Sequence, residues 1–577
     1  MPAGKRAQYT AYFRFGLCTE FLFAQDNLHM PDSVTSKPTI ILCTLNAKYI
    51  HASLGLRYLM ANMARHGSQA LADQTALLEF TLSKPLPDMV LQLLNTLGEE
   101  RPGQTQVIGF GVYIWNVLQT TELIRLLKCQ RPRLKIVLGG PEVSHETDQQ
   151  DIVKLSDHVI TGWGDVSFPK LCLQLVQGPP PLMKVIPGEQ PPMDQIALPY
   201  QHFSDADLAN RLLYVEASRG CPFKCEFCLS SLDKTAWAFE LSPFLHELKI
   251  LYERGARNFK FVDRTFNLKI EASVQILQFF LDRLNEPGAE GLLVHFEVIP
   301  DHLPDKLKAL IAKYPPGVLQ FEVGIQSFNE TVQKLISRRQ DNIQTEANLR
   351  WLINESHAHL HTDLIFGLPG ETLDSFAEGF DRLMAIGPQE IQLGILKRLR
   401  GTPIARHTVP FEMVYDDQPP YVVRKTKDLD ASSLERFTRM AKYWDLIANS
   451  GRFKTSLPLI LRPIAQPASA FRSFMHFSDH VWLSTGKTYG LTPEDLVDAV
   501  FHYLTVVREM DSSPVRASLL QDYLASGARA RPKCLAQERL PLGGEPTKQS
   551  SHEQSVSTAH KLRGRQDRHG VTAASTD

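Results

Sequence analysis

The strongest constraint on the fold is a repeated alternation of short apolar runs with amphipathic segments, in which glycines directly follow the apolar runs. The apolar runs have the length of buried strands, and the segments between them have helical spacing. In the first third of the chain, the predicted strands are 39–43, 77–80, 107–112, 135–138 and 158–160, and the predicted helices are 54–64, 89–97 and 117–127. This pattern predicts an α/β domain over 38–178, built on a doubly wound parallel sheet with ligands beyond the carboxyl ends of its strands.

A second series of alternating strands and helices follows a proline-rich linker, which is predicted over 179–208. The predicted strands of this series are 213–216, 259–262, 293–298, 319–323, 361–366 and 391–393. Six such units within 209–403 are fewer than the eight of a full barrel. They predict a partial (β/α)6 barrel or a further open sheet.

The rest of the chain has other patterns. Residues 404–533 have mainly helical spacing, and we expect a helical C-terminal domain there. Residues 534–577 are polar and lack apolar periodicity, which predicts a disordered tail. Residues 1–37 fit no clear period, and we treat them as a leader of uncertain order.

Composition narrows the class of protein. The chain has 62 basic and 63 acidic residues, so a large nucleic-acid footprint is not expected. No run of about 18 uncharged apolar residues occurs, and we expect no membrane span. Eight cysteines in 577 residues are too few for a disulfide scaffold. Because no export signal is evident, we expect the protein in the reducing cytoplasm.

Three of the cysteines, Cys221, Cys225 and Cys228, have a C-x3-C-x2-C spacing directly after the first strand of the second series. Soft thiolates in one short loop favour an iron–sulfur cluster or zinc. Structural zinc prefers four ligands, but the sequence has no second cysteine pair and the next histidine is His246. Three thiolates leave one iron of a cubane cluster open to a small molecule. The loop also follows a strand at its carboxyl end, where barrel enzymes place their chemistry.

This loop resembles the signature of the radical S-adenosylmethionine (SAM) superfamily, in which an aromatic residue, here Phe227, commonly precedes the third cysteine. The resemblance implies that Cys221, Cys225 and Cys228 hold a [4Fe–4S] cluster whose fourth iron binds SAM. It also implies reductive cleavage of SAM to a 5′-deoxyadenosyl radical, while the protein positions the cofactor and excludes water.

Later segments are similar to the SAM-binding motifs of the same family. These segments are 261–267, 322–327 and 363–372. Together with Phe227, the resemblance places Asp263, Glu322 and Gln326 beside SAM. Each segment taken alone also has a plain structural interpretation, as a helix cap or a turn into a helix.

The N-terminal region is similar to the flavodoxin-like, cobalamin-binding domain found ahead of radical SAM domains. The matching residues are Gly111, Tyr113, Gly139, Gly140, Gly162, Gly164 and Asp165. In that family, glycine turns let the backbone approach the corrin closely. The D-x-H-x-x-G motif, whose histidine ligates cobalt, is absent, because neither His51 nor His158 has the required neighbours. Some members bind cobalamin without that histidine, and a scaffold domain without the cofactor is the alternative.

The expected function is therefore that of a radical SAM iron–sulfur enzyme. Cobalamin would serve methyl transfer to an unactivated carbon, although cyclisation or another rearrangement stays open. The helical C-terminal region resembles an uncharacterised extension of one branch of this superfamily. The resemblance also implies an electron donor such as flavodoxin or ferredoxin. The substrate, a small molecule or otherwise, cannot be read from the sequence, and no nucleic-acid partner is indicated.

Two alternatives stay open at this point. One is a non-catalytic iron–sulfur or zinc-binding redox sensor. The other is a methylthiotransferase, which shares the radical SAM core and carries three more cysteines in an N-terminal domain for a second cluster. The available cysteines, Cys43, Cys129 and Cys172, are predicted instead to be core residues, because free cysteine is often a small buried hydrophobe.

Overall fold

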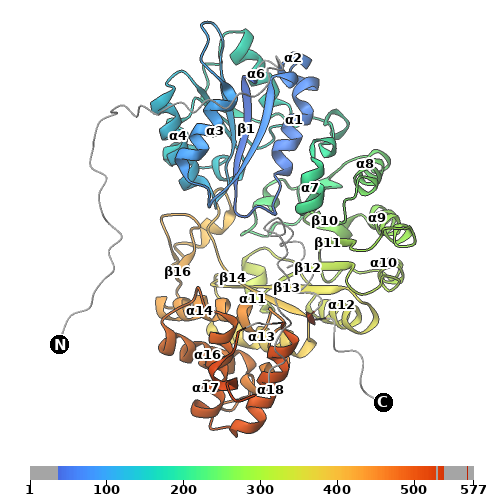
Figure 1. Cartoon of the computed structure of the whole chain (residues 1–577), viewed down its shortest axis with the longest axis vertical. Coiled ribbons are helices and arrows are strands. Elements are labelled where there is room, and N and C mark those ends of the chain that lie inside the picture. Colours follow the sequence, from blue (N-terminus) through green and yellow to red (C-terminus); the bar gives the residue numbers. More distant parts are fainter. Residues whose placement is uncertain (1–36, 528–529, 539–567, 570–577) are drawn as a thin grey trace, which may run out of the picture. The chain divides into compact units, whose positions relative to one another are not determined.

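The computed structural model describes residues 37–527, 530–538 and 568–569 (Figure 1). The predicted leader, apart from Lys37, and most of the predicted tail lie outside the described residues. Within the described ranges, no helix has the length and apolar character needed to cross a membrane.

The first third of the chain folds into the parallel sheet that the alternating pattern predicts. Its strands are β1 (Ile40–Asn46), β2 (Thr75–Thr81), β3 (Val107–Gly111), β4 (Lys135–Gly139), β5 (His158–Thr161) and β6 (Val185–Pro187). They pair in the order β2-β1-β3-β4-β5-β6, and every neighbouring pair is parallel. From β1, the chain places β2 on one side and β3 to β6 on the other, so the strand order reverses between β1 and β3. In doubly wound sheets, ligands bind in the crevice at such a switch point.

Helices cover both faces of this sheet. They are α1 (Leu54–His66), α2 (Gln69–Asp73), α3 (Leu86–Leu97), α4 (Val117–Gln130), α5 (Asp151–Leu155) and α6 (Ser167–Gln177). Helices α1 and α6 contact each other over one face, and α3 and α4 do so over the other (Figure 1). All residues of β1 are buried, as expected for a strand covered on both faces. The doubly wound fold prediction is therefore confirmed.

The region predicted as a linker, 179–208, contains part of the first domain. Strand β6 lies within it and pairs in parallel with β5 at the edge of the sheet. Edge strands tolerate proline because one side of the strand makes no ladder hydrogen bonds, and Pro187 ends β6. The predicted domain boundary at 178 is thus too early. The short helix α7 (Asp205–Asn210) then leads into the second sheet.

The second sheet is also parallel, and its strands follow sequence order. They are β7 (Leu213–Val215), β10 (Asn258–Phe261), β11 (Leu293–Val298), β12 (Leu319–Gln326), β13 (His359–Phe366) and β14 (Glu390–Ile395). In the described part of the chain, β7 and β14 are the two edges of this six-stranded sheet. Sequential parallel strands joined by helices have the topology of a barrel, and the free edges leave it open. The prediction of a partial barrel is confirmed.

The helices of this region lie along the outer side of the second sheet, where α8, α9, α10 and α12 form a row (Figure 1). They are α8 (Leu241–Glu253), α9 (Ile270–Arg283), α10 (Asp305–Ile311), α11 (Glu330–Leu335), α12 (Asn342–Glu355) and α13 (Leu373–Ile386). Aromatic side chains fill the layer between sheet and helices. Phe261 lies 4.6 Å from Phe296 and 6.1 Å from Phe280 between ring centroids. This packing holds the strand ends that carry the site.

The C-terminal region is mainly helical, as predicted. It contains α14 (Ala431–Ile447), α15 (Leu457–Ile460), α16 (Ala470–Thr485), α17 (Pro493–His502), α18 (Ser512–Ala525) and a hairpin of β15 (Val414–Tyr415) and β16 (Val423–Lys425). Helix α14 packs on β14, where the Trp444 indole donates to the Ile391 carbonyl at 2.9 Å. Leu535 is fully buried, so the ordered region continues beyond the predicted boundary at 533.

Candidate active site

The three cysteines of the C-x3-C-x2-C loop meet at one cavity. The loop follows β7, and Cys221, Cys225 and Cys228 all line a cavity of about 170 Å³ at the carboxyl end of the second sheet. The Cys228 amide donates to the Cys225 carbonyl at 3.1 Å, which closes the turn between them. Burial raises the pKa of the Cys221 and Cys225 thiols, so they keep their protons when no metal is bound. A coordinated metal ion reverses this preference, because it stabilises the thiolate.

The side chains at this cavity fit a three-thiolate cluster with one iron left open. Of the described residues that line it, none supplies a fourth thiol or an imidazole. A structural zinc ion would require such a fourth ligand. The rest of the wall carries the charged or polar residues Arg264, Glu297, Asp301, Glu322, Gln326, Arg338, Arg339, Gln340 and Asp363. Groups of both signs can pair with an amino-acid ligand that has an ammonium and a carboxylate.

Three of the residues predicted to lie beside SAM share this cavity with the cysteines. They are Phe227, Glu322 and Gln326. Gln326 has a φ of 70°, which non-glycine residues adopt rarely, where the register of β12 against β13 shifts. Strained backbone of this kind occurs preferentially at binding sites. Contact of these side chains with SAM stays a prediction.

Asp263, the fourth residue predicted to lie beside SAM, is not among the described residues that line this cavity. Its contact with SAM stays a prediction. Its carboxylate accepts hydrogen bonds from the Ala217 amide at 2.9 Å and the Ser218 hydroxyl at 2.6 Å. Burial raises the pKa of Asp263 to about 7. Asp263 therefore supports the backbone between β7 and the cysteine loop, because these two donors use both of its oxygens.

Two carboxyl groups in the cavity wall have opposite protonation preferences. Burial raises the pKa of Glu322, but His295 at 3.1 Å and Lys260 at 2.9 Å outweigh burial and hold it well below its usual range. Burial and the charges of Glu322 and Glu297 raise the pKa of Asp363 well above its usual range. Among the described residues, the buried Asp363 Oδ1 atom has no hydrogen-bond partner. The raised pKa favours the protonated form of Asp363 over the carboxylate.

Arg338 is a cavity residue that no motif indicated. Its guanidinium donates to the Gly324 carbonyl and lies 3.7 Å from the Cys225 sulfur. A cation at this distance favours the thiolate form of Cys225. The only signal in the sequence is the arginine pair, Arg338 and Arg339, that follows the fourth predicted strand.

Glu226, between the second and third cysteines, anchors the loop and was also not indicated by the sequence. Its carboxylate accepts from His407 at 2.8 Å, from Ser337 at 2.5 Å and from Arg406. Its amide donates to the Ile336 carbonyl at 3.0 Å. The side chain is only 4% exposed, so the cysteine loop is fixed from both its backbone and its side chain.

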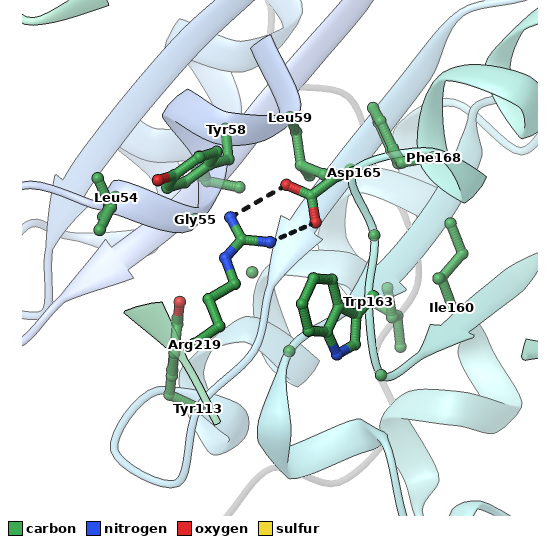
Figure 2. Close-up of a pocket in the computed structure, with 18 of the residues that line it drawn as sticks. Leu54, Gly55, Tyr58, Leu59, Tyr113, Ile160, Trp163, Asp165, Phe168 and Arg219 are labelled. Carbon is green, nitrogen blue, oxygen red and sulfur yellow. Dashed lines mark hydrogen bonds and ion pairs between the residues drawn. The ribbon is translucent and has the colours of Figure 1, made fainter. Parts of the chain in front are cut away.

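A second cavity, of about 490 Å³, opens at the switch point of the first sheet (Figure 2). All the residues predicted from the resemblance to cobalamin-binding domains line it: Gly111, Tyr113, Gly139, Gly140, Gly162, Gly164 and Asp165. Gly140 has a φ of 108°, and a Cβ there would lie 2.5 Å from the Val112 carbonyl oxygen. At Gly139 and Gly162, a Cβ would have no neighbour nearer than 3.8 Å. The glycines therefore leave an open floor that suits a large ligand lying against the backbone.

Histidine does not contribute to this second cavity. None of the described residues that line it is a histidine. His51 instead makes a 2.7 Å hydrogen bond with the Tyr214 hydroxyl, and the ring of His158 lies 3.1 Å from the Met183 carbonyl. The missing cobalt-ligating motif is therefore not replaced by a histidine from elsewhere in the described chain.

Arg219 is one of the residues that line the second cavity. Its guanidinium donates to both carboxylate oxygens of Asp165, at 2.8 and 3.2 Å, and to Glu216 at 2.7 Å. Figure 2 shows it reaching toward Asp165, and its guanidinium lies 4.1 Å from the Tyr58 ring centroid and 5.1 Å from that of Trp163. Only 16% of this side chain is exposed. Two carboxylates and two aromatic faces therefore compensate a largely buried cation.

The other cysteines of the first domain do not converge on a second cluster site. Cys43 and Cys172 are buried in separate apolar cores on opposite faces of the first sheet. Cys129 is exposed, contrary to the core position predicted for it, because the last turn of α4 lies at the surface. The ligand set that a methylthiotransferase needs is therefore not assembled by these three residues.

Three consecutive segments of the chain match known protein families. Residues 41–172 match the B12 binding domain, residues 215–383 match the radical SAM superfamily, and residues 410–569 match a protein family of unknown function (DUF4080). These segments correspond to the first sheet, the partial barrel and the helical region.

The chain spans about half the length of the curated relatives it matches. It is 23% identical over 314 residues to 2-(S-pantetheinyl)-carbapenam-3-carboxylate methyltransferase of Streptantibioticus cattleyicolor, covering 49% of this chain and 45% of the relative. It is 23% identical over 329 residues to the cobalamin-dependent radical SAM methyltransferase TokK of Streptomyces tokunonensis, covering 51% and 47%. It is 27% identical over 184 residues to the ribosomal protein uS12 methylthiotransferase RimO of a Thermotoga species, covering 31% and 43%.

A solved structure shares the fold. The radical SAM methyltransferase TsrM from Kitasatospora setae, with tryptophan substrate and a SAM analogue bound, matches with a TM-score of 0.53 at 15% identity. The match covers 72% of this chain and 90% of TsrM.

Replacing Glu226 with alanine should loosen the cysteine loop. The change removes one partner of a buried pair with His407, and such a loss costs about 3–5 kcal/mol. We expect lower iron and sulfide content per chain after reconstitution, measured by colorimetric assay, and faster cluster loss to a chelator. Glu253→Ala, at an exposed position on α8, is the control and should keep its iron. Full iron content with unchanged cluster loss in Glu226→Ala would contradict the anchoring role.

The raised pKa of Asp263 predicts a pH dependence of stability. Between the usual pKa near 4 and the folded value of about 7, the folded chain holds a proton that the unfolded chain releases. The stability from the neutral carboxyl is therefore complete below about pH 4 and is lost as the pH rises through about 7. We expect the apparent melting temperature of the wild type to fall, relative to that of Asp263→Asn, between about pH 5 and pH 7.5. A pH-independent difference between the two proteins would argue against a buried, neutral Asp263.

Proposed function

We propose that this chain, in which residues 215–383 match the radical SAM superfamily and residues 41–172 match the B12 binding domain, uses both cofactors in catalysis. In this proposal it is an iron–sulfur enzyme that cleaves SAM reductively and, with cobalamin, transfers a methyl group to an unactivated carbon. Cyclisation or another rearrangement is a second outcome of the same radical chemistry.

The two cavities lie close together along one segment of backbone, and this closeness is the main support for the proposal. Arg219 and Gly220 line the second cavity described above, here called the glycine-rich cavity. Cys221 lines the first, here called the cysteine cavity. Two residues of chain span at most about 7 Å. Gly220 makes this short connection possible, since its φ is 80° and a Cβ would lie 2.2 Å from the Thr235 carbonyl oxygen. Ligands in the two cavities would therefore be near neighbours.

The residues of the chain have separable roles in this proposal. When bound, the cluster and SAM supply a 5′-deoxyadenosyl radical, and cobalamin supplies a carrier for the methyl group. The three cysteines hold the cluster, and Arg338 favours the thiolate form of Cys225. Glu322, kept ionised by its partners, can accept hydrogen bonds from the ammonium of an amino-acid cofactor. Asp363 can donate a hydrogen bond in its protonated form, which burial and the neighbouring carboxylates favour by raising its pKa.

Methyl transfer is favoured over methylthio transfer by the cysteines of the first domain. Two of the relatives named above are methyltransferases, and one is a methylthiotransferase. Methylthiotransferases carry three additional cysteines, but Cys43 and Cys172 lie in different cores and Cys129 lies at the surface. A non-catalytic iron–sulfur sensor is the remaining alternative, and it is separated by the assay below.

A radical SAM enzyme needs an electron donor. We propose flavodoxin or ferredoxin for this role and the cytoplasm as the compartment, because cysteines that ligate iron require reducing conditions.

Replacing Cys221, Cys225 and Cys228 with alanine should abolish the chemistry. Wild-type protein reconstituted without oxygen, then given dithionite and SAM, should show iron–sulfur absorption and form 5′-deoxyadenosine. SAM labelled in its methyl group should transfer the label to added cobalamin. The triple variant should show none of these, whereas the control Cys129→Ala should show all. An intact cluster that forms neither 5′-deoxyadenosine nor labelled methylcobalamin would favour the sensor.

Replacing Gly139 with valine should fill the floor of the glycine-rich cavity without disturbing the sheet. A Cβ at Gly139 meets only the Ile160 carbonyl oxygen, at 3.8 Å, so the side chain fits the empty cavity and occupies the space a ligand needs. We expect cobalamin retained after gel filtration, measured by its absorption, to fall by at least about tenfold, which corresponds to about 1.4 kcal/mol. Iron content should not change.

The matched control for this variant is Gly178→Val, at an exposed glycine that does not line the cavity. It should retain cobalamin like the wild type. Equal cobalamin retention by Gly139→Val and Gly178→Val would place the cofactor elsewhere.

A further inference from the structure

Three side chains that can ligate a metal lie together at the amino ends of β13 and β14, away from the cysteine loop. They are His359 and His361 of β13 and Glu390 of β14. His361 and Glu390 are register partners, and His359 lies two residues earlier on the same face of its strand. Asp363, which lines the cysteine cavity, lies two residues later on that face. These three side chains, here called the His–Glu cluster, therefore lie toward the amino ends of the strands, whereas the cysteine cavity lies at the carboxyl ends.

The donor atoms of this cluster converge on one point. His359 Nε2 and His361 Nε2 lie 3.1 and 3.0 Å from the same oxygen, Glu390 Oε1. All three ligand atoms lie within 4.8 Å of one another. In a tetrahedral zinc site with bonds of about 2.0–2.1 Å, neighbouring ligand atoms are roughly 3.3 Å apart. The two nitrogen–oxygen distances are thus close to the spacing of ligand atoms in such a site.

The surroundings of the cluster also suit a bound cation. The side chains of Glu390 and His359 are only 4% and 8% exposed, and that of His361 is 22% exposed, which leaves a route from solvent. The ring centroid of His569 lies 5.4 Å from that of His359.

We propose that His359, His361 and Glu390 bind a Zn²⁺ ion that joins β13 to β14. Two imidazoles and one carboxylate are an established zinc ligand set, and imidazole ligands disfavour Mg²⁺ and Ca²⁺. The ion would connect two neighbouring strands of the barrel at the ends opposite to the cysteine loop. The site uses no residue assigned to SAM or cobalamin, so it stands independently of the proposed function.

Metal content of the full-length chain, produced without a polyhistidine tag, tests this proposal. The Cys221, Cys225 and Cys228 triple alanine variant is used as the background, because it prevents the thiolates from taking up zinc. This protein is incubated with Zn²⁺, passed through gel filtration and analysed by mass spectrometry for metals. Co²⁺ is added in a parallel sample as an absorption probe. In the same background, His361→Gln and Glu390→Gln remove single ligands, and His246→Gln changes an exposed histidine outside the cluster.

The background protein should retain about one Zn²⁺ per chain and show visible Co²⁺ bands without a thiolate charge-transfer band. Zn²⁺ should also raise its apparent melting temperature with a saturable 1:1 dependence. Both ligand variants should lose the metal and the temperature shift, whereas His246→Gln should keep them. Circular dichroism checks that each variant is folded, and either ligand variant alone is sufficient. No Zn²⁺ above the buffer level in the background, or equal Zn²⁺ in the ligand variants, would overturn the proposal and leave a hydrogen-bonded cluster without metal.

Discussion

The ion pair between Arg219 and Asp165 is the interaction on which the arrangement of the two cavities depends. Asp165 belongs to the first domain, whereas Arg219 and its second partner, Glu216, follow the first strand of the barrel. The planar guanidinium engages both oxygens of Asp165 and still reaches Glu216, which the point charge of a lysine does not reproduce. A second link between the domains, Arg400 with Glu142 at 2.9 Å, supports the same arrangement.

The electrostatics of the cysteine cavity prepare it for charged cofactors. Buried thiols with a raised pKa become thiolates only when a metal compensates them, so cluster binding and loop order are coupled. Lys260 and His295 lower the pKa of Glu322 and favour its carboxylate, whereas burial and nearby carboxylates raise the pKa of Asp363. One wall therefore combines an anion, an acid with a raised pKa and arginines, a combination that can bind a ligand with both an ammonium and a carboxylate.

The features that the sequence predicted depend on local patterns. The alternation of the strands, the glycines after β4 and the cysteine spacing can each be recognised within a few neighbouring residues. Both cavities could therefore be predicted from the sequence. The roles of Glu226 and Asp263 could not, because their partners come from other parts of the fold, and His407 lies 181 residues after Glu226. The cluster of His361 and Glu390 depends on the register of β13 against β14, which hydrophobic patterning does not specify. The core position predicted for Cys129 was wrong, because the prediction relied on its apolar neighbours in the sequence and not on its place in the last turn of α4.

The proposed function requires that the cluster and cobalamin occupy adjacent cavities joined by the segment from Arg219 to Cys221. Electron paramagnetic resonance of the reduced protein loaded with both cofactors measures whether they do. We expect the cob(II)alamin signal to be broadened or split by magnetic coupling to the reduced [4Fe–4S] cluster, and we expect the effect to disappear in the triple cysteine variant. A cob(II)alamin signal from bound cofactor that is identical with and without the reduced cluster would show that the two cofactors are not neighbours.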